Sequence, residues 1–563
     1  MTIEERVNQW TASPFDDNTI NEIKELQKSP ADLEDAFYKD IAFGTGGMRG
    51  IMGVGTNRIN RYTLGKASQG LANFLNKQTK DKRPKIVIAY DCRNNSRSFA
   101  NSVAEVFSAN QIDTYLFSSL RPTPLLSFAV RHLGAQAGIV LTASHNPPEY
   151  NGYKVYNQQG GQIVPPDDTA IMKEIESVDF SDILWQKDKQ RIHLIDQEID
   201  EAYTTSIIKE SFLTAKERKN TSVVFTPLHG TSIISLPPVL DGAGYEHIHI
   251  IKEQEQPNGN FPTVVSPNPE EPEAFTIALA KAKEIDADIV LGTDPDADRI
   301  GIGLKDNNHE WILLNGNQLM VVLTRFVLEQ SKLSPDTFIA STIVSTPLMT
   351  KLAEAFNIEC KLGLTGFKWI GKMIEDFPDQ KFLCGGEESY GFLLGDEVRD
   401  KDAISAALLA CDLQAHLKAK GSSIYDYLLD TYLRYGCFQE TLVSETKKGR
   451  KGAEQINQFM HRLREETPLA IGHYSVVKIE DFLKGIAKDH LGEIRNIELP
   501  KANVLKFHLS NGATVAIRPS GTEPKIKFYF SVNAALTSIE DYPSLQKKLI
   551  QQCEELMLAV NQL

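Results

Sequence analysis

Residues 137–156 read AGIVLTASHNPPEYNGYKVY. The first five are apolar and partly β-branched, so they predict a buried strand that carries Ser144 into a loop at its carboxyl end. Ligands of open α/β sheets bind at that end. The prolines and the Asn-Gly pair that follow turn the chain into a second strand at 153–156. The pattern predicts that Ser144, His145 and Lys154 share one rigid loop, although a strand, a turn and a strand with a polar surface remain the alternative.

The sequence around Ser144 disfavours a hydrolase. A nucleophile elbow needs Gly-x-Ser-x-Gly, whereas Ala143 precedes this serine and His145-Asn146-Pro147 follow it. A serine hydroxyl beside an imidazole, an amide and an ammonium is instead suited to carry a phosphoryl group.

Composition narrows the class of protein. The chain has 563 residues, which suggests about four domains, and 41% hydrophobic with 24% charged residues, as in soluble globular proteins. Its net charge of −14, without a block of like charges, argues against nucleic acid and anionic membranes as partners. The first residues do not form a secretory signal, no apolar run is long enough to span a membrane, and six scattered cysteines form no Cys-x-x-Cys pair. These features predict a cytoplasmic protein.

A second motif, Asp294-Pro295-Asp296-Ala297-Asp298-Arg299, follows the apolar run at 287–293. In an extended chain the three aspartates would face one way, so we expect their carboxylates to converge. Hard oxygen ligands select Mg²⁺ and leave coordination sites for a phosphate oxygen and water. An EF-hand is excluded because its sixth position is Arg299 and its twelfth is Lys305. A solvated acidic turn remains the alternative.

Three further loops offer ligand-binding groups. Residues 43–50, FGTGGMRG, permit close backbone approach and carry Arg49. At 385–391, GGEESYG places Glu387 and Ser389 at a strand end, where a carboxylate and a hydroxyl can bind a vicinal diol. At 518–525, RPSGTEPK combines a guanidinium, hydroxyls and a glycine, which together suit a phosphate dianion, without the spacing of a nucleotide P-loop. Each of these loops could also be an ordinary solvated turn.

The hexapeptide at 142–147, TASHNP, resembles the phosphoserine loop of the α-D-phosphohexomutases, the phosphoglucomutase and phosphomannomutase superfamily. The aspartates with Arg299 resemble its metal loop, 385–391 its sugar-binding loop and 518–525 its phosphate-binding loop. The four motifs occur in the order phosphoserine, metal, sugar, phosphate, so the resemblance covers nearly the whole chain.

The resemblance implies an α/β fold with three similar mixed α/β domains and a smaller C-terminal α+β domain around a central cleft. We place the domains at 1–205, 206–315, 316–445 and 446–563, each with one of the four loops in that order.

The resemblance also implies roles for individual residues. The expected catalytic residues are Ser144, His145, Lys154 and Arg49, and the expected ligands of Mg²⁺ are Ser144, Asp294, Asp296 and Asp298. The residues expected to bind substrate are Arg299, Thr365, Gly366, Lys368, Glu387, Ser389, Arg518, Ser520, Gly521, Thr522 and Lys525. The division of acid and base roles between His145 and Lys154 stays open.

The implied activity is that of a phosphosugar mutase with a small-molecule hexose phosphate as partner. The long chain and the GGEESYG loop are most similar to the bacterial α-phosphoglucomutases, which implies conversion between glucose 1-phosphate and glucose 6-phosphate through glucose 1,6-bisphosphate. Mannose and pentose phosphates remain alternative substrates. Alternatives of other classes are a Mg²⁺-dependent sugar phosphatase and a catalytically silent sensor of sugar phosphates.

The net charge adds a further prediction. A protein of charge −14 repels a sugar phosphate at long range, so we expect Arg49, Lys154, Arg299, Lys368, Arg518 and Lys525 to cluster and to reverse the local potential.

Overall fold

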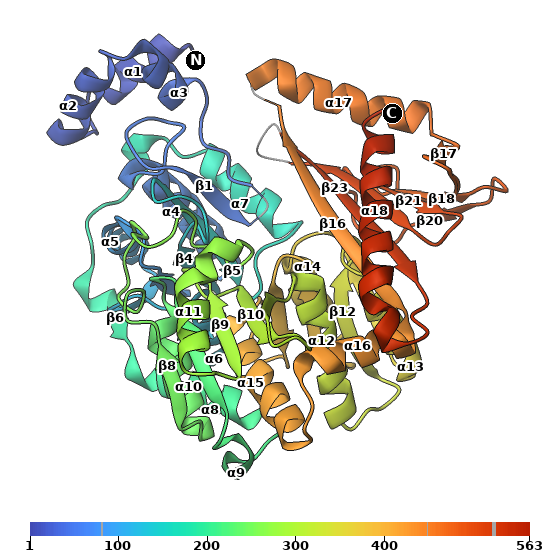
Figure 1. Ribbon diagram of the computed structural model, residues 1–563. Helices are drawn as coiled ribbons and strands as arrows, with labels where there is room; N and C mark the ends of the chain where they lie inside the picture. The colour runs from blue at the N-terminus through green and yellow to red at the C-terminus, as the bar shows by residue number, and fades with distance from the viewer. Residues whose placement is uncertain (45, 80–82, 448, 521–524) are drawn as a thin grey trace. The chain divides into compact units, whose positions relative to one another are not determined.

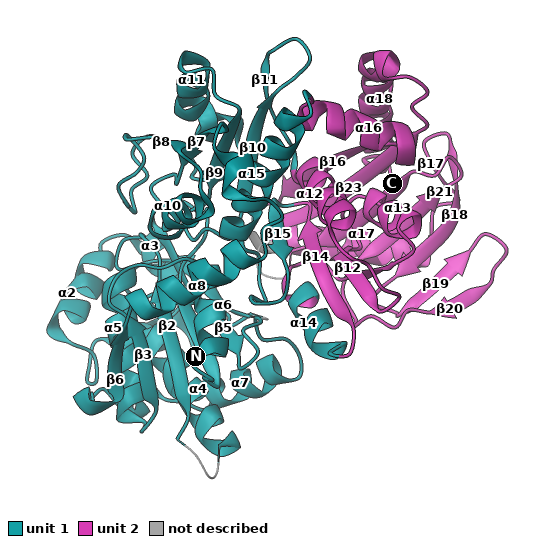
Figure 2. Ribbon diagram, turned by 90° about the horizontal axis from the view of Figure 1, so that it is seen from below, with its two compact units in different colours: residues 1–315, 370–378, 389–421 teal, residues 316–369, 379–388, 422–563 magenta. Residues whose placement is uncertain are grey.

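The computed structural model describes residues 1–44, 46–79, 83–447, 449–520 and 525–563. The chain forms two compact units (Figure 2). Unit 1 comprises residues 1–315, 370–378 and 389–421, and unit 2 comprises residues 316–369, 379–388 and 422–563. None of the helices within the described ranges is both long and apolar enough to cross a membrane.

Unit 1 begins with a helical arm. The arm consists of α1 (Ile3–Trp10), α2 (Asp17–Leu26) and α3 (Pro30–Phe37), shown in dark blue in Figure 1. The arm is polar in composition but contains an aromatic cluster. The Trp10 ring stacks on the Phe15 ring with centroids 4.3 Å apart and packs edge-on against the Tyr62 ring with centroids 5.8 Å apart. Trp10 is fully buried, so the arm is fastened to the body of unit 1 by hydrophobic packing.

The first sheet of unit 1 has the order β1-β5-β4-β2-β3-β6. Strands β2, β3, β4 and β6 are parallel, and β5 runs antiparallel to both β4 and β1. Helices pack against both β2 and β4, which fits the burial of every residue of these strands except the half-buried Lys85. The strands are β1 (Gly47–Ile51), β2 (Lys85–Tyr90), β3 (Asp113–Phe117), β4 (Ala137–Leu141), β5 (Tyr150–Asn157) and β6 (Ile192–Ile195). The helices are α4 (Arg61–Gln78), α5 (Ser96–Ala109), α6 (Thr123–His132), α7 (Asp167–Glu176) and α8 (Gln197–Lys209).

The second sheet of unit 1 has the order β11-β10-β9-β7-β8. Strands β7, β8 and β9 are parallel, while β9 and β10 form the antiparallel pair whose connection holds the aspartate motif. The strands are β7 (Ser222–Thr226), β8 (His247–Ile250), β9 (Ile289–Thr293), β10 (Ile300–Lys305) and β11 (Trp311–Leu313). The helices are α9 (Ala215–Arg218), α10 (Ser232–Ala243), α11 (Thr276–Glu284) and α15 (Ala403–Ala419), and strand β15 (Gly391–Leu394) also belongs to this unit.

Unit 2 combines a parallel sheet with an antiparallel one. In the parallel part β12 lies between β13 and β14. Its strands are β12 (Thr337–Thr342), β13 (Glu359–Gly363) and β14 (Lys381–Glu387), and its helices are α12 (Gly316–Gln330), α13 (Leu348–Ala355) and α16 (Ile424–Tyr435). Helix α14 (Lys368–Asp376) begins in unit 2 and continues in unit 1.

The C-terminal sheet has the order β16-β23-β22-β21-β18-β19-β20, with β17 paired to β18. Helix α18 contacts β16 and β23 along its length (Figure 1). The strands are β16 (Cys437–Thr446), β17 (Ala470–Ile471), β18 (Tyr474–Asp481), β19 (Ile486–Asp489), β20 (Ile494–Asn496), β21 (Leu505–Leu509), β22 (Thr514–Pro519) and β23 (Lys525–Ala534). The helices are α17 (Gly449–Glu465) and α18 (Tyr542–Val560).

Three mixed α/β sheets with helices and a C-terminal α+β sheet confirm the predicted fold class. The domain limits stay a prediction. Residue 205 lies inside α8 and residue 445 inside β16, whereas 315 coincides with the last residue of the first segment of unit 1.

Candidate active site

The loop that carries Ser144 follows β4, whose residues are all buried. The Ser144 amide donates a hydrogen bond to the Thr142 hydroxyl at 2.8 Å, and the serine adopts φ +50°. This turn directs the Ser144 hydroxyl towards two partners. Oγ donates to Oδ2 of Asp294 at 2.5 Å and lies 3.2 Å from Nδ1 of His145. The predicted juxtaposition of Ser144 with the first aspartate is therefore present within unit 1.

A buried arginine holds the Ser144 loop in place. The Arg93 guanidinium, at the end of β2, donates to the carbonyl oxygens of Ser144 (2.5 Å), Pro147 (2.8 Å) and Tyr150 (3.0 Å), and also to that of Asn146. These carbonyls take the place of water around the buried cation. The loop is thus held by hydrogen bonds from one side chain to its backbone.

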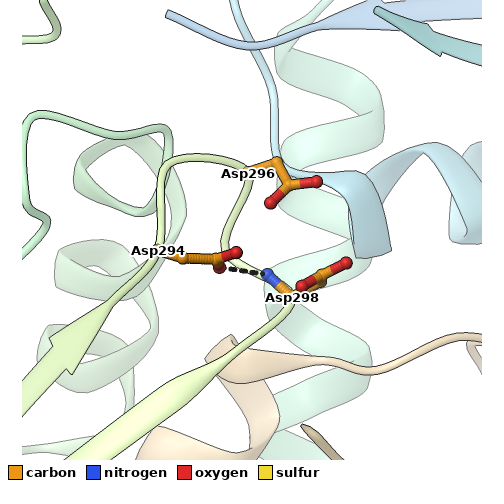
Figure 3. Close-up of side chains that lie close together, drawn as sticks. All are labelled: Asp294, Asp296 and Asp298. Carbon is orange, nitrogen blue, oxygen red and sulfur yellow. Dashed lines mark hydrogen bonds between the residues drawn. The ribbon is translucent and has the colours of Figure 1, made fainter. Parts of the chain in front are cut away.

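The aspartate motif converges through a turn, which corrects the predicted extended conformation. The Ala297 amide donates to the Asp294 carbonyl, and Ala297 adopts φ +54°. Oδ1 of Asp294 accepts hydrogen bonds from the amides of Asp298 and Arg299, each at 3.0 Å. A tight turn stabilised by its own first aspartate brings the three side chains together on one short connection between β9 and β10 (Figure 3).

The three carboxylates fit a hard divalent cation. Asp294, Asp296 and Asp298 are buried, and each offers an oxygen within 4.8 Å of the others. In the part of the chain that the structure describes, Oδ1 of Asp296 and Oδ1 of Asp298 are buried without a hydrogen-bond partner. Buried carboxylate oxygens are stabilised by hydrogen bonds or by metal coordination. This donor set suits Mg²⁺.

Two lysines compensate part of the negative charge. Lys154 on β5 donates to Asp296 at 2.8 Å and to Asp298 at 3.2 Å. Although burial favours the neutral amine, these two carboxylates raise the pKa of Lys154. Burial, together with the charges of Asp296 and Asp298, raises the pKa of Asp294. This is the carboxyl group that accepts the hydrogen bond from the Ser144 hydroxyl.

The second lysine, Lys401, was not among the predicted site residues. Its ammonium lies 3.3 Å from Oδ2 of Asp298 and 3.1 Å from Oδ1 of Asp400. It precedes α15 and lies more than a hundred positions after Asp298 in sequence. A lysine between two aspartates at the start of an apolar helix was the signal available in the sequence.

The predicted residues His145, Arg49 and Arg299 lie near one another. Burial, with the charges of Arg299 and Arg49, holds the pKa of His145 well below its ordinary value, so its imidazole is neutral near pH 7. Nη1 of Arg49, on β1, donates to Oδ1 of Asn146 at 3.1 Å. Arg299 forms an ion pair with Glu270.

The sugar-loop residues Glu387 and Glu388 lie in unit 2. Glu387 ends β14 and is 5% exposed. Glu388 accepts a hydrogen bond from the Ser345 hydroxyl at 2.8 Å. Burial and, after it, the charge of Glu388 raise the pKa of Tyr529, whereas Arg518 lowers it. Glu388 of the sugar loop and Arg518 of the predicted phosphate loop thus both act electrostatically on Tyr529 within unit 2.

The other residues predicted to bind the sugar are divided between the units. Thr365, Gly366 and Lys368 belong to unit 2 and Ser389 to unit 1. Within the described ranges the Thr365 hydroxyl is buried without a hydrogen-bond partner, and Gly366 adopts φ +107°. The Lys368 ammonium lies over the Trp369 ring, 5.5 Å from its centroid.

The predicted phosphate loop is described in part. Arg518 lies near the end of β22, and the Ser520 amide donates to the Lys525 carbonyl at 2.7 Å where the loop meets β23. Gly521 and Thr522 lie outside the described residues.

The predicted cluster of six cations is described in two parts. Arg49, Lys154 and Arg299 belong to unit 1, and Lys368, Arg518 and Lys525 to unit 2. Clustering of all six stays a prediction.

Four family models match the chain. They are the phosphoglucomutase/phosphomannomutase α/β/α domain I (residues 40–182), domain II (201–307), domain III (315–432) and C-terminal domain (477–539). The arm therefore lies outside the segment that the first model matches.

Curated relatives and solved structures agree with these matches. The phosphoglucomutase of Staphylococcus epidermidis strain ATCC 12228 is 37% identical over 533 residues, which cover 93% of this chain and 96% of that protein. The phosphoglucomutase of Staphylococcus aureus strain USA300 is 37% identical over 520 residues, with coverage of 91% and 93%. A phosphoglucomutase/phosphomannomutase family protein of Burkholderia thailandensis has the same fold with a TM-score of 0.67, 16% identity, and coverage of 92% and 97%. The Paramecium phosphoglucomutase parafusin, in its open form, has a TM-score of 0.67 at 17% identity, with coverage of 92% and 96%.

Proposed function

The chain belongs to the phosphoglucomutase/phosphomannomutase family, and from this premise we propose that it interconverts α-D-glucose 1-phosphate and glucose 6-phosphate. The enzyme is an intramolecular phosphotransferase, with Ser144 as the phosphoryl carrier. The choice of glucose rests on the names of the staphylococcal relatives. Glucose 1,6-bisphosphate is the proposed intermediate, and the proposed compartment is the cytoplasm.

One observation carries the proposal. The Ser144 hydroxyl lies 2.5 Å from a carboxylate of the aspartate turn, next to two buried carboxylate oxygens that lack hydrogen-bond partners in the described chain. Asp294, Asp296 and Asp298, together with the Ser144 oxygen, would hold Mg²⁺. When bound, the ion would neutralise charge on the phosphoryl oxygens during transfer.

The proposed reaction has two transfers. The bond between Ser144 Oγ and phosphorus breaks as a sugar hydroxyl oxygen bonds to that phosphorus and releases its proton to a base. In the second transfer Ser144 takes the phosphoryl group at the other end of the bisphosphate, and the sugar oxygen left behind regains a proton. Phosphate is conserved, so the net result is isomerisation.

The electrostatics support different roles for His145 and Lys154. Burial and the charges of Arg299 and Arg49 lower the pKa of His145, which leaves a neutral imidazole 3.2 Å from Ser144 Oγ. Such a group can accept a proton. Lys154 stays charged beside Asp296 and Asp298. We therefore assign proton exchange to His145 and charge compensation to Lys154, with Arg49 as a ligand of the transferring phosphoryl group.

Substrate binding is assigned to the loops that resemble those of the family. The proposed sugar ligands are Arg299, Thr365, Gly366, Lys368, Glu387 and Ser389, and the proposed ligands of the second phosphate are Arg518, Ser520, Gly521, Thr522 and Lys525. The electrostatic effect of both Glu388 and Arg518 on Tyr529 supports a shared function for the two loops of unit 2. We also propose that the four domains of the chain end at residues 205, 315, 445 and 563.

A coupled assay tests the function. The protein, with Mg²⁺ and a trace of glucose 1,6-bisphosphate, is incubated with the 1-phosphates of glucose, mannose, glucosamine and ribose, and both isomer and free phosphate are measured. We expect the highest kcat/KM with glucose 1-phosphate and no phosphate release. Release of phosphate in place of isomer would identify a phosphatase, and binding without turnover would identify a sensor.

Ser144→Ala is the matched variant for this assay. The serine is small and 5% exposed, so alanine fills nearly the same space while removing the acceptor oxygen. We expect loss of turnover with sugar-phosphate affinity nearly unchanged. Substantial residual mutase activity would exclude Ser144 as the carrier.

A further inference from the structure

Strand β5 directs two side chains to the same region of the aspartate turn. Lys154 and Tyr156 are two positions apart and so lie on one face of the strand. Lys154 reaches Asp296 and Asp298 directly. The Tyr156 hydroxyl instead donates to Oδ2 of Asp400 at 2.8 Å. The family resemblance assigned no function to Tyr156.

Asp400 connects Tyr156 to the second lysine. Its other oxygen, Oδ1, accepts from the Lys401 amide at 2.8 Å and from the Lys401 ammonium at 3.1 Å. The same ammonium lies 3.3 Å from Oδ2 of Asp298. The route from Tyr156 to the aspartate turn therefore runs through three contacts: Tyr156 to Asp400, Asp400 to Lys401, and Lys401 to Asp298. It begins in the interior, since Tyr156 is fully buried and Asp400 is 1% exposed.

The tyrosine hydroxyl decides how the ammonium is shared. Because Tyr156 occupies Oδ2 of Asp400, that carboxylate cannot turn both oxygens towards Lys401. Part of the ammonium's electrostatic attraction is thereby left for Asp298. In a buried network each donor and acceptor is fixed by its partners, so removal of the hydroxyl would free Oδ2 to attract the ammonium.

We propose that Tyr156 is a positioning residue, whose hydroxyl acts through Asp400 to hold the Lys401 ammonium against Asp298. Strand β5 thus sets both compensating charges of the aspartate turn, Lys154 by direct contact and Lys401 by way of Asp400. The consequence for turnover rests on the proposed phosphoryl transfer, in which the ammonium compensates charge beside the transferring group. The consequence for metal affinity does not depend on that function.

A second tyrosine, which contacts the same loop at Asp402, provides a matched control. Tyr203 on α8 is fully buried, and its hydroxyl donates to Asp402 at 2.8 Å. Asp402 also accepts from the amides of Ile404 and Ser405, as the cap of α15. Tyr156→Phe and Tyr203→Phe therefore each remove one hydroxyl from one buried carboxylate, but only the first carboxylate holds Lys401.

The first measurement compares kinetics. We expect Tyr156→Phe to lower kcat for glucose 1-phosphate by about fivefold or more, with KM changed by less than about twofold, because the displaced charge acts on the transfer step. Tyr203→Phe should leave kcat within about twofold of the wild-type value. In a Lys401→Met background, Tyr156→Phe should have no further effect on kcat, since the group through which it acts is gone. Equal losses in the two tyrosine variants, or additivity with Lys401→Met, would overturn the proposal.

The second measurement is Mg²⁺ affinity by calorimetry, without substrate. An ammonium on Asp298 competes with the ion, so Tyr156→Phe should lower the Kd for Mg²⁺ by about threefold or more as Asp400 draws the ammonium away. Asp400→Asn should raise the Kd for Mg²⁺. The Lys401 ammonium would then have Asp298 as its remaining carboxylate partner in this network and would compete more strongly with the ion. Shifts of the same sign in both variants, or an unchanged Kd in either, would contradict the proposal. The changes in the Kd for Mg²⁺ test the positioning role of Tyr156 even if the wild-type protein shows no mutase activity. Absence of mutase activity would refute only the proposed function.

Discussion

Two residues of the proposed site adopt left-handed backbone conformations that are uncommon outside glycine. They are Ser144, with φ +50°, and Ala297, with φ +54°. Each conformation is unfavourable by roughly 1 to 3 kcal/mol for a residue with a Cβ atom. The first directs the Ser144 hydroxyl to Asp294, and the second lets the Asp298 amide bond to the same aspartate. Backbone strain is thus located at the two turns that bring the serine and the carboxylates together.

The charge balance of the aspartate turn predicts the effect of removing Lys154. Its partners Asp296 and Asp298 are 0% and 3% exposed, and the lysine itself is 21% exposed. Lys154→Met keeps the length of the side chain but leaves two buried carboxylates short of one cation. We expect a loss of roughly 3 kcal/mol in the free energy of unfolding without Mg²⁺. Added Mg²⁺ should raise the Tm of the variant more than that of the wild type, because the ion replaces the missing charge.

Lys77→Met is the control for this measurement. Lys77 pairs with Glu174 at 2.6 Å but is 67% exposed, so its removal should change stability by less than about 1 kcal/mol. A Lys154→Met protein as stable as this control in the absence of Mg²⁺ would contradict the inferred charge balance.

The sequence predicted the main residues of the aspartate turn but not its full environment. Asp294, Asp296 and Asp298 follow one strand, so local spacing was sufficient to bring them together, although the geometry is a turn and not an extended segment. Lys401 joins them from a distant loop. A contact between residues so far apart depends on tertiary packing, which spacing does not encode.

At the scale of elements, the antiparallel pair of β1 and β5 positions Arg49 and Lys154. Gly47 pairs with Lys154 in this register and adopts φ +143°. A Cβ atom at Gly47 would lie 1.9 Å from the Tyr153 carbonyl oxygen. The neighbour is backbone, so the strands themselves would have to separate.

Gly47→Ala should therefore impair both stability and catalysis. We expect a loss of roughly 3 kcal/mol or more, from strain in the backbone together with the steric clash, and a fall of about a hundredfold in kcat/KM as Arg49 is displaced. Thermal unfolding and the mutase assay measure the two effects. Gly134→Ala is the control, since Gly134 adopts φ +60° with open space around its Cβ position. If the two variants behave alike, the clash with β5 is not the cause.

The long pair of β16 and β23 contains a carboxyl group whose pKa is perturbed. Burial raises the pKa of Glu440 to about 7, despite hydrogen bonds from Thr346 and Ser531. The folded state therefore binds a proton more tightly than the unfolded state. The stabilisation that results is complete below the ordinary pKa of the residue and is lost as the pH rises through about 7.

Glu440→Gln should remove this pH dependence. The wild type should lose up to about 3 kcal/mol more than the variant between about pH 5 and about pH 8, as measured by urea unfolding at both pH values. The exposed Glu354 provides the control substitution, Glu354→Gln, which should leave the pH profile unchanged. A variant whose stability falls with pH as steeply as that of the wild type would refute the assignment.

The strands that lead into the site were predicted because they are strongly patterned, whereas the strand expected at 153–156 spans Tyr150–Asn157. Strands β4 and β9 are largely apolar runs, and the Asn-Gly pair at 511–512, a common hairpin signal, lies in the turn between β21 and β22. The aromatic cluster of the arm was not predicted. Trp10 and Tyr62 belong to separate helices, and an amphipathic helix does not indicate which partner covers its apolar face.

At the scale of the whole molecule, the order of segments in sequence differs from their grouping in space. Residues 389–421 belong to unit 1 although 316–369 belong to unit 2. A buried ion pair explains part of this grouping: Arg218 donates to Asp412 at 2.8 Å, and the Tyr245 hydroxyl donates to the same carboxylate. This packing fixes α15 beside the second sheet and with it the loop that carries Lys401. The two compact units therefore do not follow the order of segments in the sequence.

The overall charge and the local charge of unit 1 have opposite effects on an anionic substrate. The protein carries −14, whereas Arg49, Arg93 and Arg299 all act on His145 beside Ser144. Screening by salt extends over about 8 to 10 Å at moderate ionic strength. The sign of the salt effect on substrate capture therefore reveals which of the two charges the substrate encounters.

We expect kcat/KM for glucose 1-phosphate to fall by roughly two- to fivefold as NaCl is raised from about 20 to about 300 mM at constant Mg²⁺. Salt would then be weakening the attraction to the arginines near Ser144. Repetition with KCl separates screening from specific ion effects. Arg49→Gln should flatten the salt dependence, because one of the attracting charges is removed, whereas neutralising the exposed Lys77 in Lys77→Gln should leave it unchanged. A rise of kcat/KM with salt would mean that the net charge of −14 dominates and that the predicted basic site does not form.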